Sequence, residues 1–407
     1  MKRFVVALTL AGALLLSLSG CSLFTQKAPS APSSPLIKVS PGEPGYPRFR
    51  DDLDYESLEE AVAQSLLYYS RLPKDRTFLF GQNRYSLGAM VRSAMELLYL
   101  IQYRPDGETL DQIIRENFDV YRSLGRDGEG GVLFTGYYEA QLYGARERSE
   151  VFRYPVLAKP ENLVTINLNR FPGVKVSGKK HLVGRITEKG EVIPYYSRIQ
   201  MGGSEARNLT PHATALAWVD DSVDLFFLEI QGSGVISLND GTQMRVQYQG
   251  KNGHPYRSIG RYLIQKGEMT REEVSMQSIR RWLQEHPNRR QEVFNYNPSL
   301  VFFREGVSGP LGCYGAPVTA GRSIATDRRV FPAGAIAFIE TEKPDQQGLD
   351  EIRWKSFGRF VLNQDTGGAI KGAGRVDLFT GYGPDAEFVA GQMKQNGSLF
   401  FLIRKAR

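Results

Sequence analysis

The stretch DTGGAIKGAGRVDLFTGYG, residues 365–383, joins a glycine-rich loop to an alternating strand pattern. In the segment RVDLF, Val376 and Leu378 face one side of a strand, while Arg375 and Asp377 face the other. Aspartate is disfavoured inside strands, so Asp377 needs a reason to be there, either chemistry or solvation beside Arg375. The loop matches neither GxxxxGK(S/T) nor GxGxxG, the spacings of the common phosphate-binding loops. The stretch therefore predicts a strand that presents a carboxylate on one face.

Strand patterns dominate the rest of the chain. Alternating or β-branched runs predict strands over 132–139, 224–237, 244–248, 301–304, 335–340, 359–363 and 399–404. Apolar residues at helical spacing predict helices near 58–69, 90–101, 113–118, 259–266 and 274–285, with a further short helix opened by Pro384. The first three helices precede the first predicted strand. These patterns predict a mainly β fold with accessory α-helices.

The N-terminus has the pattern of an exported and anchored protein. Two basic residues precede the apolar run 4–16, which is too short to span a bilayer comfortably and is typical of a signal peptide over residues 1–20. The next residues, Leu-Ser-Gly-Cys, resemble the bacterial lipobox, which implies that Cys21 receives lipid and becomes the mature N-terminus. Residues 21–50 are rich in proline without an apolar period, so we expect an extended tether there.

Composition and motif spacing exclude several classes of function. The chain is 41% hydrophobic and 23% charged, which is globular composition. Its net charge of +7 comes without a basic run interleaved with aromatics, so nucleic acid is not predicted, whereas an anionic polymer such as peptidoglycan is compatible. No HExxH, CxxC or GxSxG is present and the four histidines lie far apart, so no metal, cofactor or serine nucleophile is predicted. Cys313 is expected to be a small packed residue. Of the classes of catalysis considered, acid–base chemistry by carboxylates is the one that remains.

Six blocks of the sequence carry a resemblance to a known family. They are FTGYYEAQL (134–142), LEIQGSGVI (228–236), YQGKNGHPYRSIGRYLI (248–264), VSMQSIRRWL (274–283), NPSLVFF (297–303) and DTGGAIKG with VDLFTGYGPDA (365–372 and 376–386). In this order they resemble the membrane-bound lytic murein transglycosylase A family, from about residue 131 onwards. The resemblance implies a double-psi β-barrel domain, built from 51–138 with 306–407 and including the N-terminal helices. It also implies a smaller inserted β domain at 139–305, with a substrate groove between the two.

The resemblance also implies a reaction. The family cleaves the β-1,4 bond between N-acetylmuramic acid and N-acetylglucosamine without water and leaves a 1,6-anhydro ring. The position that matches the family's catalytic aspartate is Asp377, and Asp365 is a supporting candidate whose commoner role is to shape a turn before glycines. One carboxylate suffices because the C6 hydroxyl of the sugar is an internal nucleophile. Asp377 would need a pKa about two units above its usual value, although Arg375 on the same face opposes that.

The matched blocks also contain candidate contacts to the sugar chain. They are Tyr137, Tyr138, Gln231, Ser233, Asn252, His254, Tyr256, Arg257 and Lys371. Each has a structural alternative: the polar groups could stabilise turns, and alternation along a strand requires at least one of the two tyrosines to face the core.

Two other functions stay open from the sequence. An inverting hydrolase on the same barrel would need a second carboxylate as base, for which Asp365, Glu340 and Asp327 are candidates. A non-catalytic lipoprotein would bind peptidoglycan without cleaving it. In each case we expect two partners, the glycan strands and the membrane through Cys21. By analogy with the family we expect the outer membrane, facing the periplasm, while any cell-wall synthesis partner stays unspecified.

Overall fold

The computed structural model describes residues 34–173, 180–202, 213–306, 309–346 and 352–406. Strands outnumber helices in this part of the chain, which confirms the predicted mainly β class with accessory helices. The predicted signal peptide, Cys21 and the first part of the tether lie outside the described residues. None of the helices that the structure describes is long and apolar enough to cross a bilayer.

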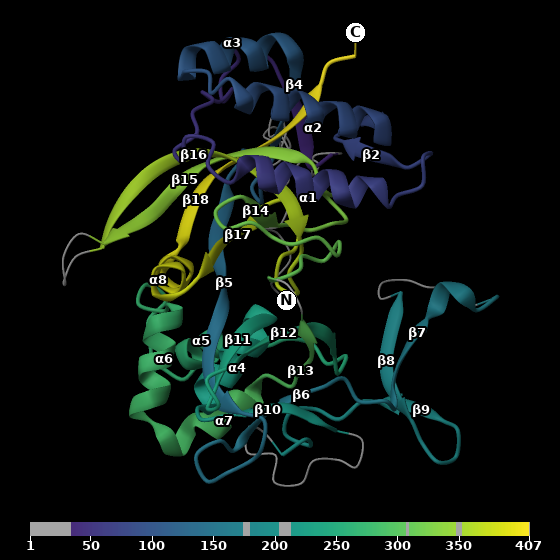
Figure 1. Cartoon of the computed structure of the whole chain (residues 1–407), viewed down its shortest axis with the longest axis vertical. Coiled ribbons are helices and arrows are strands. Elements are labelled where there is room, and N and C mark those ends of the chain that lie inside the picture. The colour runs from purple at the N-terminus through teal and green to yellow at the C-terminus, as the bar shows by residue number, and fades with distance from the viewer. Residues whose placement is uncertain (1–33, 174–179, 203–212, 307–308, 347–351, 407) are drawn as a thin grey trace, which may run out of the picture. The chain divides into compact units, whose positions relative to one another are not determined.

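Six strands close into a barrel. Their order is β18, β15, β16, β14, β17 and β5, and β5 then pairs with β18 to complete the ring (Figure 1). The strands are β5 (Val132–Ala145), β14 (Ser323–Ala325), β15 (Ile336–Gln346), β16 (Ile352–Asp365), β17 (Arg375–Tyr382) and β18 (Lys394–Arg404). The β14–β16 and β17–β5 pairs are parallel and the other pairs are antiparallel. A closed ring leaves no free edge among the six strands.

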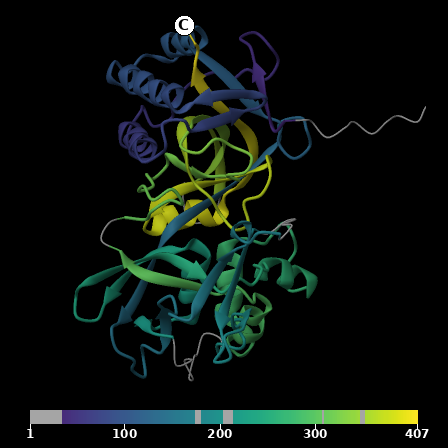
Figure 2. The ribbon, with the colours of Figure 1, turned by 90° about the vertical axis from the view of Figure 1, so that its right-hand side faces the viewer.

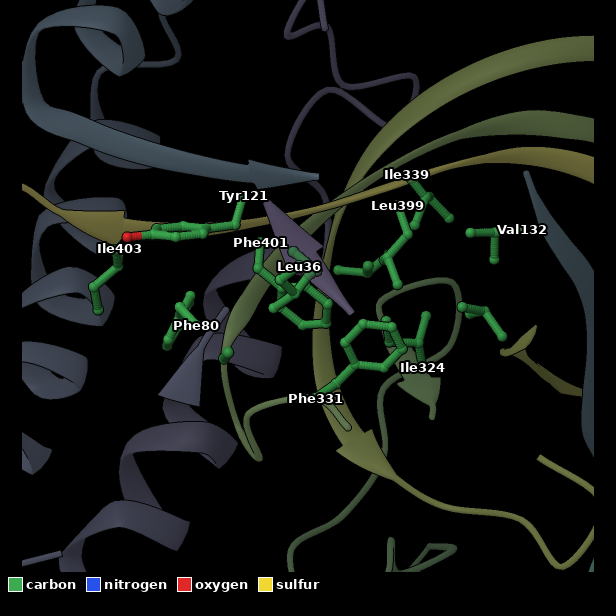
Figure 3. Packing of buried hydrophobic residues seen from close by; sticks show 14 of the residues in the cluster. Leu36, Phe80, Tyr121, Val132, Ile324, Phe331, Ile339, Leu399, Phe401 and Ile403 are labelled. Carbon is green, nitrogen blue, oxygen red and sulfur yellow. The ribbon is translucent and has the colours of Figure 1, made fainter. Parts of the chain in front are cut away.

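The alternation of the barrel strands separates two hydrophobic cores. Residues such as Phe134, Val376 and Leu378 belong to one cluster, in which the rings of Phe331 and Phe401 stack with centroids 5.1 Å apart (Figure 3). The opposite faces of β15, β16 and β18 contribute to a second cluster with the N-terminal helices. The burial of Val376 and Leu378 confirms the alternation predicted from RVDLF.

The N-terminal helices pack on the second of these clusters. They are α1 (Leu58–Ser70), α2 (Leu87–Gln102) and α3 (Gly107–Asn117), close to the predicted ranges. Ser86 and Asp106 cap α2 and α3 by accepting the backbone N–H of the third helical residue. Ser93 of α2 accepts the backbone N–H of Arg404 at 2.8 Å, which joins the helix to β18. In Figure 2 the yellow strand that ends at the C-terminus runs beside the blue N-terminal helices.

The expected tether is partly folded, and this corrects the prediction for residues 34–50. Leu36–Val39 form β1, which pairs with β4 (Phe118–Ser123), and β4 in turn pairs with β18. Phe49 is fully buried against the rings of Phe338 and Phe360. Strand β1 precedes α1, and β2 (Thr77–Phe80), β3 (Asn83–Ser86) and β4 all precede β5. The predicted order of three helices before the first strand is therefore wrong. Four-residue strands are too short to show a clear period in sequence.

A buried ion pair fastens the segment before α1 to the barrel. The guanidinium of Arg322 donates to both carboxylate oxygens of Asp51, at 2.6 and 2.8 Å, and to the carbonyl of Glu56. Both side chains are almost inaccessible to solvent. The backbone N–H groups of Leu53 and Tyr55 also donate to Asp51, so its charge is fully compensated.

The region between β5 and β14 is built on the far half of β5. Strand β11 pairs in parallel with residues 140–144 of β5, and β12 and β13 follow in antiparallel order. Its strands are β6 (Tyr154–Leu157), β7 (Leu163–Asn167), β8 (His181–Ile186), β9 (Val192–Pro194), β10 (Ala215–Val219), β11 (Ser233–Leu238), β12 (Gln243–Lys251) and β13 (Val301–Gly306). Its helices are α4 (Ser222–Gln231), α5 (Ile259–Gln265), α6 (Met276–Glu285) and α7 (Arg290–Tyr296). One strand is therefore shared by the barrel and this region.

The strand predicted over 224–237 is wrong in its first half, which forms α4. Asp221 caps the helix by accepting the backbone N–H of Val223 at 2.6 Å, and Gly232 ends it with φ at 85°. Its apolar side chains belong to two different hydrophobic clusters. Leu225 and Leu228 lie in one, and Phe226 and Phe227 lie in the other. A helix buried on both sides has a continuous apolar run, which periodicity cannot distinguish from a buried strand.

The barrel and the β11–β13 region meet at α8 (Pro384–Gln392), as predicted a short helix opened by proline. A Cβ added to Gly136 of β5 would lie 2.6 Å from the Cα of Ala390 in α8, so only glycine allows this approach. Arg280 of α6 forms ion pairs with Asp224 of α4 and Glu387 of α8. Gln277 of α6 donates to the carbonyl of Glu387.

Candidate active site

One row of the barrel places both candidate aspartates side by side across the strands. Ala325 of β14 is paired with Asp365 of β16 on one side and with Asp377 of β17 on the other. Asp377 is paired in turn with Thr135 of β5, and Thr135 with Lys394 of β18. At about 4.8 Å per strand, the Cα atoms of the two aspartates are roughly 10 Å apart. The row thus runs from Asp365 through Asp377 and Thr135 to Lys394, whose ammonium donates to the carbonyl of Arg271.

Asp377 has the environment of a group that can stay protonated. Burial raises the pKa of Asp377 to about 6, the positive charge of Arg375 opposes this, and the negative charge of Asp365 adds to it. The Oδ1 atom of Asp377 is buried without a hydrogen-bond partner among the described residues. This is about the rise that a general acid at this position needs near neutral pH. A partly buried carboxyl with a free oxygen can give a proton to a bound acceptor.

Asp365 is held by three donors. The hydroxyl of Tyr137 donates to its Oδ2 at 3.0 Å, and the backbone N–H groups of Cys313 and Thr366 each donate to its Oδ1 at 2.8 Å. Burial raises the pKa of Asp365 to about 6, and these hydrogen bonds counteract the rise. Asp365 is therefore a positioned neighbour of Asp377, whereas the Asp377 carboxyl is the less constrained of the two. Cys313 itself is exposed, so the expectation of a packed residue is wrong.

Tyr137 belongs to the site because its hydroxyl donates to Asp365. Burial and the negative charge of Asp365 raise the pKa of Tyr137 well above its usual value, so it is a hydrogen-bond donor at any working pH. Its ring lies 5.1 Å from the ring of Phe379, centroid to centroid. Tyr138 is buried in the core on the other face, and its backbone N–H donates to Gln231 at 3.1 Å. Alternation thus separates the two tyrosines as predicted.

Arg375 lies beside Asp377, and Tyr256 lies near Arg375. One guanidinium nitrogen of Arg375 donates to Thr135 Oγ1 at 3.3 Å, while its Nε is buried without a partner among the described residues. Desolvation raises the pKa of Tyr256, and the positive charge of Arg375 opposes the rise, which puts the tyrosine near the arginine. Tyr256 is 41% exposed and comes from the region between β12 and α5. An exposed aromatic ring near Arg375 is suited to contact a sugar.

The glycine-rich loop is organised by Asp327 rather than by Lys371. Asp327 accepts the backbone N–H of Gly372 at 2.9 Å and forms an ion pair with Arg329, whose guanidinium holds the pKa of Asp327 well below its usual range. The nitrogen of Lys371 is exposed and lies 3.5 Å from the carbonyl of Gly367. Asp327 therefore has a structural role, which makes it a poor candidate for the base of a hydrolase.

Most other predicted sugar contacts stabilise the backbone. Asn252 is buried and satisfies the carbonyls of Tyr196 and Pro298, and His254 Nε2 lies 2.8 Å from the carbonyl of Tyr195. Arg257 donates its backbone N–H to Asn297 and places its guanidinium 5.8 Å from the Tyr296 ring. Ser233 begins β11 opposite Gln247. The structure does not bring these four residues into contact with Asp377.

Sequence reasoning missed Thr135 and Lys394, which complete the row around Asp377. Thr135 lies within the matched block FTGYYEAQL, but its place beside Asp377 depends on the parallel pairing of β5 with β17, which no local pattern encodes. Lys394 donates to the carbonyl of Arg271 at 2.9 Å. Among the described residues, no group of three or more His, Cys, Asp or Glu side chains is placed to hold a metal ion.

Comparisons with known proteins agree with this architecture. Residues 133–304 match the family model described as the MltA specific insert domain, and residues 322–403 match the 3D domain. The chain is 31% identical to membrane-bound lytic murein transglycosylase A of Escherichia coli K12 over 287 residues, which covers 70% of this chain and 69% of that protein.

Two solved structures have the same fold. A membrane-bound lytic murein transglycosylase from Agrobacterium tumefaciens superposes with a TM-score of 0.70 and 31% identity, covering 91% of this chain and 97% of the other. E. coli MltA with bound chitohexaose superposes with a TM-score of 0.69 and 25% identity, covering 92% and 96%. The chain belongs to the membrane-bound lytic murein transglycosylase A family.

Proposed function

We propose that this protein is a peptidoglycan lytic transglycosylase in which Asp377 acts first as acid and then as base. Membership of the family supplies the reaction: cleavage of the β-1,4 bond between N-acetylmuramic acid and N-acetylglucosamine. The observation that supports the assignment of the acid is the partly buried Asp377, with a pKa near 6 and an unpartnered Oδ1.

The reaction needs one proton carrier. Asp377 donates its proton to the glycosidic oxygen as the bond between C1 and that oxygen breaks. The C6 hydroxyl of the muramic residue then attacks C1, and its proton passes to the Asp377 carboxylate. The products are a free 4-hydroxyl on N-acetylglucosamine and a 1,6-anhydro ring, and Asp377 is again protonated. No water is consumed, so no second carboxylate is required.

Neighbouring groups have supporting roles in this proposal. Asp365 favours the protonated form of Asp377 through its charge and is itself positioned by Tyr137. Arg375 and Tyr256 are proposed sugar contacts beside the acid, and Lys371 is an exposed candidate on the loop. We further propose that residues 139–305 form the inserted glycan-binding domain and that 51–138 with 306–407 form the catalytic domain.

Membrane attachment is proposed from the leader sequence. Relatives carry the description membrane-bound, and the chain has a signal-peptide pattern ending in Leu-Ser-Gly-Cys. We propose that lipid on Cys21 anchors the protein in the outer membrane with its folded part in the periplasm. Metabolic labelling with a clickable fatty acid tests this, since Cys21→Ser is expected to lose the label and the membrane association together.

Product analysis tests the reaction. Purified sacculi are digested with the protein and the fragments are analysed by mass spectrometry. We expect anhydro-muramic ends from the wild type and none from Asp377→Asn, while Asp385→Asn, an exposed aspartate in the same sequence block, is expected to retain activity. Reducing ends, heavier by one water, would identify a hydrolase, and binding without products would identify a scaffold protein.

A further inference from the structure

A polar surface continues from the row of Asp377 along β5. Thr135 is paired with Asp377, and Tyr137 and Glu139 follow Thr135 at every second position, so these side chains lie on one face of the strand. Beyond the barrel, β11, β12 and β13 extend the sheet from β5 (Figure 1). The acid and this surface therefore share the same side of one strand.

A buried carboxylate fixes a cation on this surface. Glu139 is 1% exposed, and its Oε2 accepts a hydrogen bond at 2.7 Å from one guanidinium nitrogen of Arg245 on β12. The side chain of Arg245 is 36% exposed, and its other N–H groups have no hydrogen-bond partner among the residues that the structure describes. Glu139 thus orients a forked donor whose remaining N–H groups are free for a ligand.

A second arginine lies beside the first without a counter-ion. Arg304 of β13 is paired with Gln247, two residues after Arg245 on β12, so the Cα atoms of the two arginines are roughly 7 to 8 Å apart. Arg304 is exposed, donates to Gln247 Oε1 at 3.5 Å, and has no carboxylate within ion-pair distance in the described part of the chain. We call Glu139, Arg245 and Arg304 the Arg245 site. Two cations and one carboxylate leave a positive charge, which favours an anionic ligand.

The Arg245 site lies within reach of a group attached to a sugar at the acid. Glu139 is four residues from Thr135 along β5, and Asp377 is one strand further across, so the Cα atoms of Asp377 and Glu139 are roughly 14 to 15 Å apart. An extended peptide of five residues spans roughly 17 to 18 Å. Because both groups lie on the same face of the sheet, such a peptide does not have to pass around the barrel.

We propose that the Arg245 site binds a carboxylate of the peptide stem of the peptidoglycan substrate. The N-acetylated sugars carry no charge, and where a stem is attached the free carboxylates are those of the peptide. Arg245 and Arg304 pair with the stem carboxylate, and Glu139 is a positioning residue that orients Arg245. The inference rests on the proposed function, because it takes the stem-bearing glycan as the substrate. The enzyme then cleaves stem-bearing strands in preference to bare ones.

Binding of a free peptide tests the Arg245 site without catalysis. The probe is a synthetic pentapeptide, acetylated at its N-terminus and carrying two carboxylates, titrated into the whole protein by calorimetry. Arg304→Gln, which leaves the ion pair of Glu139 intact, is expected to weaken binding at least about fivefold, and Arg245→Gln/Arg304→Gln at least about twentyfold. Arg92→Gln on the exposed face of α2 is the control. With both carboxylates of the probe converted to carboxamides, wild type and variants should bind equally weakly.

Kinetics separate recognition of the stem from a structural role. The ratio of kcat/KM on stem-bearing strands to kcat/KM on bare glycan is expected to fall at least about fivefold in Arg304→Gln. Glu139→Gln releases Arg245 and should lower the same ratio about threefold. A purely structural role for Glu139 would lower both values of kcat/KM together and leave their ratio unchanged.

The outcomes against the site differ from those against the reaction. No binding of the pentapeptide by the wild type, equal affinity of wild type and Arg304→Gln, or an unchanged kinetic ratio would overturn the Arg245 site. Absence of anhydro products from the wild type on both glycans would instead overturn the proposed function, and the calorimetric result does not depend on it.

Discussion

Replacing Arg375 by glutamine is expected to extend the activity of the protein to higher pH. Arg375 lies two residues before Asp377 on the same face of β17, and its positive charge lowers the pKa of Asp377. The acid must be protonated when bond cleavage begins, so kcat/KM falls as the pH rises through the pKa of Asp377. Without the cation, the pKa of Asp377 rises, and the alkaline limb of the pH profile moves to higher pH.

The size of the shift follows from the strand geometry. Two residues along a strand span roughly 7 Å. Two unit charges at that distance interact by about 0.6 kcal/mol in bulk water and by about 2.4 kcal/mol at an effective dielectric constant of 20. The alkaline limb should therefore move up by about 0.4 to 1.7 pH units, at about 1.36 kcal/mol per unit.

The assay is the pH dependence of kcat/KM on a soluble glycan fragment, measured from pH 4 to 9. Arg375→Lys is the matched control because it keeps the charge while it loses the forked donor geometry, so its limb should stay at the wild-type position. The reasoning is refuted if Arg375→Gln leaves the alkaline limb in place or moves it to lower pH. It is also refuted if Arg375→Lys moves the limb as far as Arg375→Gln does.

Four further predictions concern the carboxylates. Asp365→Asn removes a negative charge beside Asp377, so the alkaline limb should move down by about 0.3 to 1 pH unit, measured in the same profiles; an upward shift would contradict the charge effect. Asp377→Asn should lower kcat/KM by about 10²- to 10⁴-fold. The same variant should raise the free energy of unfolding in urea by about 1 to 3 kcal/mol at pH 7.5 and change it little at pH 4. The reason is that the folded-state pKa of Asp377 is raised, so its ionised form destabilises the fold. The same difference between variant and wild type at both pH values would argue against a desolvated carboxyl. Asp51→Ala leaves the buried charge of Arg322 uncompensated and should cost about 3 to 5 kcal/mol of unfolding free energy, whereas a loss below about 1 kcal/mol would mean that water reaches the pair.

The face of Asp377 was predictable, but its neighbours were not. Alternation in RVDLF assigns Val376 and Leu378 to the core, since period two is a local property of a strand. Thr135 and Ala325 become neighbours of Asp377 only through pairing between segments distant in sequence. The opposing effects of burial and Arg375 were expected, yet which of them prevails depends on how the folded barrel excludes water.

Polar residues of the matched blocks were harder to assign. Asn252 and His254 occur in a block typical of the family, and a motif alone does not reveal whether such residues contact a substrate or a carbonyl. In the structure both are satisfied by backbone carbonyls, as buried or partly buried polar groups require. Tyr256, a few residues further along, remains 41% exposed near Arg375. The difference lies in tertiary packing, which the residue types do not encode.

The closure of the barrel by β18 has a consequence for how the chain folds. Strand β5 is synthesised early, but its barrel partners β17 and β18 follow only after the whole β6–β13 region. A chain that emerges N-terminus first therefore holds a long strand with unmatched edges until its final strands are made. Because the most distant pairing forms last, chaperones and proteases encounter an open barrel first. Shortening the chain before Lys394 should yield an aggregation-prone product rather than a weaker enzyme.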